Sequence, residues 1–154
     1  MTDYVAPPGL DPSWEKETFT RLKNLCQWGV VEHRVRDNGG VLLTLTCVKQ
    51  RTARFADRDD PEVAALIDLL RELVSENRRM SWAKLLWIVL ALEVEDPNLD
   101  LNAEQRRGLA GREFRGGRNT VGAGSIRKHQ EPKAIRILAD LVIGREVAAR
   151  DGAG

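Results

Sequence analysis

The residues best suited to chemistry are the basic side chains near the C-terminus. Residues 1–101 hold 13 Lys/Arg and 17 Asp/Glu, a net charge of −4, whereas residues 102–154 hold 11 and 6, a net charge of +5. Arg115, Arg118, Arg127 and Lys128 surround one glycine-rich stretch. Positive charge concentrated in this way favours binding of a polyanion. The alternative is a solvated surface of mixed charge.

The glycine-rich stretch does not match a nucleotide-binding loop. The run Gly122-Ala123-Gly124-Ser125 lacks the Gly-Lys-Ser/Thr ending of a P-loop, and no apolar strand precedes it. Ser125 and His129 are four residues apart and would share a helix face, but no orienting acid or oxyanion loop is identifiable. Neither nucleotide hydrolysis nor nucleophilic catalysis is expected from this segment.

Metal chemistry is not indicated either. Cys26, His33, Cys47 and His129 are isolated residues, whereas zinc sites use short paired spacings. We expect the two cysteines to be buried thiols that act as small apolar residues. The acidic run Asp57–Asp60 lacks the alternating ligands of a calcium loop. The sequence therefore predicts no enzymatic activity, no metal and no cofactor.

Composition limits the class of protein. The chain has 154 residues, of which 42% are hydrophobic and 31% charged, values typical of a globular protein rather than a disordered one. Two cysteines cannot form a disulfide framework, and the first residues do not resemble a signal segment. The longest apolar run, Leu85–Leu92, is far shorter than the about 20 residues that span a bilayer. A cytoplasmic location is expected.

The first 50 residues predict a tail, a helix and a β-hairpin. Residues 1–10 contain two prolines and a glycine and are expected to be a flexible tail. A helix is predicted over 14–28, ended by Gly29. Two runs rich in β-branched residues, 30–36 and 41–48, flank Asp37-Asn38-Gly39-Gly40, a strong hairpin signal.

The register of this hairpin follows from the apolar residues. Val31, Val35, Leu43 and Leu45 share one face only if Val35 pairs with Val41. That pairing requires an odd loop of three or five residues, closed by a glycine in the left-handed region, for which Gly39 is the candidate. His33 would then lie half-buried on the apolar face.

Residues 60–150 predict a helical domain. Asp60-Pro61-Glu62 has the composition of a helix start, and Asn102 with Gln105 resembles a capping box. A helix capped by Ser81 is predicted over 82–94, a short helix near Gly124-Ser125, and a last helix from Pro132 to about Arg150.

The predicted helix over 82–94 has almost no polar face. Such a helix lies at the centre of a core or in an oligomer interface. Together with Leu69, which falls on a second face of the preceding helix, it favours a twofold homodimer.

The segment from Asn102 onward resembles a helix-turn-helix, in which a short second helix enters the major groove of DNA. Ala110 matches the small residue where two helices cross, and Ile126 matches the apolar residue that holds the recognition helix to the core. The segment is also similar to a C-terminal module of bacterial proteins with an Arg-Arg-x-x-Ala-Gly helix. Ala110 and Ile126 are sixteen residues apart, more than a compact turn allows. The excess indicates either a longer basic loop that meets phosphate or a helical bundle without a groove-reading helix.

The resemblance implies a set of DNA-binding residues. By this pattern Ser125, Arg127, Lys128 and His129 would face DNA, and Arg107, Arg115, Arg118 and Asn119 would contact phosphates.

A second resemblance covers Leu22–Thr46. It is similar to the end of a winged helix domain, where a helix leads through Gly-Val-Val-Glu into a two-stranded wing that closes on Leu-Thr. Only about thirteen residues precede it, so the two helices that usually come first would be supplied by later segments or be absent.

The sequence thus predicts a mostly α (α+β) protein with a tail at 1–10, a helix plus wing-like β-hairpin at 11–50, and four to five helices at 60–150. The expected function is that of a non-catalytic bacterial regulator that binds duplex DNA. The alternative is an adaptor module, such as an effector-associated domain of a signalling or defence system, whose interface would be the apolar helix. DNA binding requires a contiguous basic face that includes Arg106 and Arg107, whereas an adaptor requires an uncovered apolar patch.

Overall fold

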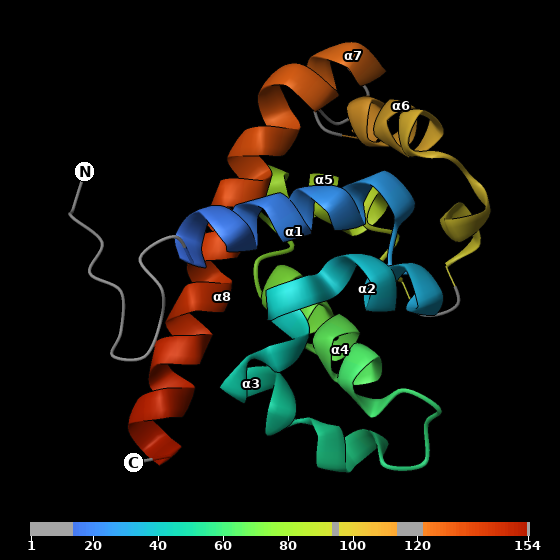
Figure 1. Cartoon of the computed structure of the whole chain (residues 1–154). Coiled ribbons are helices and arrows are strands. Elements are labelled where there is room, and N and C mark those ends of the chain that lie inside the picture. Colours follow the sequence, from blue (N-terminus) through green and yellow to red (C-terminus); the bar gives the residue numbers. More distant parts are fainter. Residues whose placement is uncertain (1–13, 94–95, 114–121, 154) are drawn as a thin grey trace.

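The computed structural model describes residues 14–93, 96–113 and 122–153, and every regular element in these ranges is a helix (Figure 1). The predicted tail at 1–10 lies outside them. The α-helices are α1 (Trp14–Trp28), α2 (Glu32–Gly39), α3 (Thr46–Lys49), α4 (Pro61–Ser75), α5 (Ser81–Val89), α6 (Ala103–Glu113), α7 (Ala123–Ser125) and α8 (Glu131–Ala153). Short 3₁₀ segments span Gly40–Thr44, Thr52–Phe55 and Pro97–Asp100, and Ile126–Gln130 is a π-helix.

The predicted β-hairpin, and with it the α+β class, is wrong. Residues 32–39 form α2, a 3₁₀ turn follows, and residues 46–49 form α3. Leu42 and Leu43 are both buried, whereas the predicted hairpin, with one apolar and one solvated face, would expose one of the two. Gly39 is helical, and Gly40 takes the positive φ of 49° at the end of α2. The glycine pair therefore ends a helix, and the wing-like part of the 11–50 unit is not formed.

Three helix boundaries that were predicted from local chemistry are confirmed. Gly29, with φ of 75°, follows the end of α1. The Asp60 carboxylate accepts a 3.3 Å hydrogen bond from the N–H of Val63 and caps α4, whose first residue is Pro61. Asn102 and Gln105 form the reciprocal capping box at the start of α6, with bonds of 3.0 and 2.8 Å.

Helix α8 contacts most of the other long helices of the protein. It packs against α1, α3, α4 and α5, and Figure 1 shows it running along one side with α1 crossing it. Its buried residues include Ile135, Leu138 and Val142, which join Leu22 and Leu25 of α1 in one hydrophobic core. No helix in the described part is both long and apolar enough to cross a membrane.

Helix α5, which corresponds to the apolar helix predicted over 82–94, lies in this core. Helix α5 ends at Val89, earlier than predicted, and Ser81 makes no side-chain cap. Leu85, Leu86 and Leu69 are at most 1% exposed. Burial within one chain therefore explains the apolar pattern, which no longer argues for a dimer; self-association stays a prediction.

Candidate nucleic-acid interface

Residues 123–153 form one continuous helix instead of a recognition helix and a separate supporting helix. Pro132 lies inside it, as the second residue of α8 after the π-helix Ile126–Gln130. Proline lacks an N–H, and its ring crowds the carbonyl four residues earlier, so a wider turn at this point accommodates it. This helical run also changes direction near α7 (Figure 1). The expected break before the last helix is absent.

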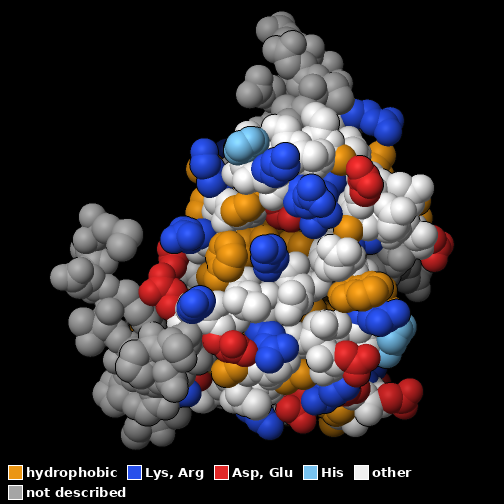
Figure 2. Space-filling view, turned by 45° about the horizontal axis from the view of Figure 1, so that its top comes forward, with side chains coloured by type: hydrophobic (Ala, Val, Ile, Leu, Met, Phe, Trp, Pro, Cys, Tyr) orange, Lys and Arg blue, Asp and Glu red, His pale blue; other side chains and the backbone are white. Residues whose placement is uncertain are grey.

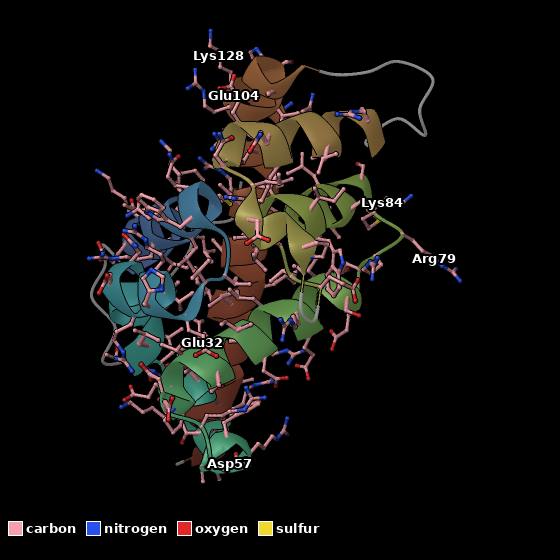
Figure 3. All side chains as sticks on the ribbon, turned by 90° about the vertical axis from the view of Figure 1, so that its right-hand side faces the viewer. Glu32, Asp57, Arg79, Lys84, Glu104 and Lys128 are labelled. Carbon is pink, nitrogen blue, oxygen red and sulfur yellow. The ribbon has the colours of Figure 1, made fainter. Side chains whose placement is uncertain are left out.

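The π-helix presents the polar residues that the sequence singled out. Ser125, Arg127, Lys128 and His129 are all exposed. Between them Ile126 is fully buried, as is Ala110 of α6, so both residues that were expected to hold this segment to the core do lie in it. Figure 3 shows Lys128 at one extreme end of the molecule, near the exposed Glu104 of α6.

Arg107, expected on phosphate, faces the interior. Its Nε and one Nη each donate a 3.0 Å hydrogen bond to the Glu131 carboxylate, and its exposed fraction is 8%. Such a bidentate pair satisfies both side chains within the fold. Arg107 therefore joins α6 to the start of α8 and is not available to a ligand in this conformation.

Arg106 is buried more deeply, at 1% exposed. Its guanidinium donates to the carbonyl oxygens of Cys26 and Gln27 at 2.9 and 3.1 Å, to that of Val89 at 2.8 Å, and to that of Leu101. The first two are carbonyls in the last turn of α1, which have no partner within that helix. Burial lowers the pKa of Arg106 from its usual value. The Arg106-Arg107 pair is thus structural, and the basic face expected to include it does not form.

A different basic face does form, from helices that are far apart in the sequence. It consists of five exposed side chains: Lys16 and Lys23 on α1, Arg127 and Lys128 on the π-helix, and Arg136 on α8. We call this set the α1–α8 basic face. Within the described residues, none of the five forms an ion pair with a carboxylate. Figure 2 shows basic side chains bordering an apolar strip at this end of the molecule.

The surface between α1 and α8 contains two hollows that share Phe19. One, of about 320 Å³, is lined by Phe19, Lys23, Arg127, Lys128, Glu131, Pro132 and Ile135. The other, of about 310 Å³, is lined by Glu15, Lys16, Phe19, Arg136, Ala139 and Asp140. The Arg136 guanidinium lies 5.6 Å from the centre of the Phe19 ring. We call the two hollows together the Phe19 groove.

The acidic side chains that line the Phe19 groove offset its positive charge more in one hollow than in the other. The carboxylate in the first hollow, Glu131, is already bonded to Arg107. Glu15 and Asp140 line only the second hollow. The three cations Lys23, Arg127 and Lys128 therefore dominate the first hollow, where a negatively charged ligand is best stabilised.

Only part of this surface is predicted from the sequence. Arg127 and Lys128 were expected to contact a ligand, whereas Lys16, Phe19, Lys23 and Arg136 were not. Lys16, Phe19 and Lys23 stand at i, i+3 and i+7, a spacing that places them on one helix face. That signal is present in the sequence, but nothing local indicates that α8 lies beside this face.

Three expected ligand residues lie outside the described residues, namely Arg115, Arg118 and Asn119. His33, expected half-buried in a hairpin, is exposed on α2. The cysteines are buried and free, as expected. Burial raises the pKa of Cys47 to about 12 and that of Cys26 well above its usual value.

No group of three or more potential metal ligands occurs within the ranges the structure describes. Comparison of the chain with protein-family models, curated proteins and solved structures finds no match.

Proposed function

We propose that this protein is a non-catalytic DNA-binding protein that contacts the phosphate backbone through the α1–α8 basic face. The observation that carries the proposal is the set of five exposed cations without a carboxylate partner among the described residues. Their charge is free to displace the counterions that surround DNA, and this release is the main source of sequence-independent affinity. A role as a regulator of transcription belongs to the same proposal.

The surface differs from the one that the helix-turn-helix resemblance implies. Ser125, Arg127, Lys128 and His129 remain candidate contacts because they are exposed together at the end of the molecule. Lys16, Lys23 and Arg136 replace the buried Arg106 and Arg107 as candidate phosphate contacts. Arg115, Arg118 and Asn119 keep their predicted role, which the described residues do not test.

The adaptor alternative loses the interface that supported it. Leu85, Leu86 and Val89 of α5 are buried in the core. Within the described residues, the large hydrophobic side chains that remain exposed are Trp28, Met80 and Ile137. Trp28 is partly covered by the Arg34 guanidinium, 4.0 Å from the ring centre. Single exposed apolar residues are common on monomers and do not by themselves form a docking patch.

Salt dependence and a matched charge change test the proposal. The association constant for a short duplex should fall with salt with a log–log slope of roughly −0.9 per phosphate contacted, so about five contacts imply a roughly 500-fold loss over a fourfold rise in salt. The double variant R127A/K128A should weaken binding and make this slope shallower by about 1.8.

The control is R79A/K84A, which removes the same charge from exposed positions in the α4–α5 region, distant from Lys128 in Figure 3. This variant should bind almost as the parent does. Equal losses in the two double variants, or no binding of the parent at low salt, would refute the proposed interface.

A further inference from the structure

The Phe19 groove differs from an ordinary basic surface because it has an apolar floor. The partly exposed side chains of Phe19 and Pro132 form this floor, above the buried side chains of Ile135 and Ala139. Phosphate groups gain nothing from such a floor, since they are satisfied by the cations at its edge. The floor therefore indicates that the ligand also carries flat or apolar groups.

The cations lie on both sides of the aromatic ring along the groove. Lys16 and Arg136 share one hollow with Phe19, and Lys23, Arg127 and Lys128 share the other. A nucleic-acid strand that ran along the groove would thus place phosphates in each hollow and one base at the ring. Base-stacking on an aromatic side chain between backbone-binding cations is the common arrangement in proteins that bind single strands.

A duplex cannot use this arrangement fully. Its bases are paired and stacked inside the double helix, so it would contact the cations at the groove edge and leave the floor empty. An unpaired strand can turn a base toward Phe19, where the base would displace the Arg136 guanidinium that lies 5.6 Å from the ring centre. The floor residues offer no side-chain hydrogen-bonding groups, so this contact would tolerate any base.

We infer that the Phe19 groove binds an unpaired stretch of nucleic acid, with one base stacked on Phe19 and the flanking phosphates on the α1–α8 basic face. This inference rests on the proposed function and adds its substrate class: single-stranded or locally opened DNA is preferred to intact duplex.

The experiment compares a labelled thymidine oligonucleotide of about 12 nucleotides with a duplex of the same length, using the full chain. The parent should bind the single strand more tightly. Phe19→Leu should weaken single-strand binding about tenfold or more and change duplex binding less than twofold. Phe19→Tyr keeps the ring and should retain single-strand binding.

Phe55→Leu is the matched control, because Phe55 is a partly buried phenylalanine that packs on the core and does not line the groove. It should leave single-strand binding unchanged. Thermal unfolding of each variant identifies loss of folding. If Phe19→Leu does not fold, the parent decides the question, because equal binding of single strand and duplex by the parent would by itself overturn the inference.

The outcomes separate the two proposals. Duplex and single strand bound equally, with no effect of Phe19→Leu, would overturn the inference and leave DNA binding intact. Failure to bind either nucleic acid would overturn both. A polyglutamate peptide that displaces the oligonucleotide at equal concentration of charge would assign the groove to an acidic protein segment and overturn the inference.

Discussion

The carboxylate of Glu146 accepts a 2.9 Å hydrogen bond from the backbone N–H of Cys47, 99 residues earlier in the chain. It also accepts a 3.0 Å bond from the N–H of Thr46. These two donors open α3, a four-residue helix without a side-chain cap of its own. Arg150 donates a 2.8 Å bond to the same carboxylate, which is completely buried. A side chain of α8 thus performs the role that an N-cap residue usually has.

Glu146→Gln should destabilise the protein, and more at neutral than at acidic pH. Burial alone would raise the pKa of Glu146, but the bonds from Arg150, Cys47 and Thr46 outweigh it and lower this pKa below its usual value. A lowered folded-state pKa contributes stability above the unfolded pKa of about 4.3, and this contribution is lost as the pH falls through the lower folded value. Glu146→Gln should lower the free energy of unfolding at pH 7 by about 1–3 kcal/mol.

Urea unfolding across pH 2–7 measures this difference. Asp57→Asn is the control, since Asp57 is an exposed acid at the opposite end of the molecule from Lys128 (Figure 3). The stability of Glu146→Gln should depend less on pH below 5 than that of the parent. An unchanged pH dependence would show that this carboxylate does not hold α3.

Arg106→Lys should destabilise the fold strongly despite keeping the charge. The guanidinium serves carbonyl oxygens from the end of α1, from Val89 and from Leu101, and an ammonium cannot reach this set in the same geometry. The bonds to the carbonyls of Cys26 and Val89 are buried, so leaving these carbonyls without donors should cost about 2–4 kcal/mol. The exposed Arg112 of α6 gives the control Arg112→Lys, which should be nearly neutral in the same unfolding assay. Equal effects at the two positions would contradict the role of Arg106.

Substituting alanine for Gly40 and for Gly144 should change the stability of the protein in opposite directions. Gly40 has φ of 49°, and an added Cβ would lie 2.5 Å from Arg21 Nε. The left-handed backbone costs a non-glycine residue roughly 1–2 kcal/mol, so Gly40→Ala should destabilise. Gly144 is exposed within α8, and nothing lies within 4 Å of the position that an added Cβ would take. Gly144→Ala should stabilise by about 0.5–1 kcal/mol. Melting temperatures compared side by side test both signs, and a stabilising Gly40→Ala would contradict the assigned turn.

The features that sequence predicts here are those decided within one turn of chain. Asp60 and the Asn102–Gln105 pair identify helix starts because each cap and its target are three residues apart. Asn38-Gly39-Gly40 is misleading because glycine with positive φ ends a helix as readily as it closes a hairpin. The periodicity of residues 30–48 does not distinguish the two.

The remaining features depend on how helices pack. Glu146 reaches Cys47, and Arg106 reaches Cys26, only once the fold brings together residues 80 or more positions apart. A buried arginine and an exposed one look alike in sequence, so the sequence alone assigns Arg107 to phosphate. For the same reason, only part of the candidate interface can be predicted from the sequence. Arg127 and Lys128 belong to a local basic cluster, whereas Lys23 lies beside them only because α1 packs against α8.

Because Arg107 and Glu131 form a buried ion pair, the losses of stability caused by substitutions at these two positions should not be additive. Glu131→Gln leaves the Arg107 guanidinium buried without its counter-charge, which should cost about 3–5 kcal/mol. The double variant Arg107→Met/Glu131→Met removes both charges and should be more stable than either single Met variant, because no unpaired ion remains. The unfolding free energies of the parent, the two single Met variants and the double Met variant give the coupling energy directly. Additive losses would mean that Arg107 is free of Glu131 in solution and available to phosphate, as its place in the basic sequence suggests.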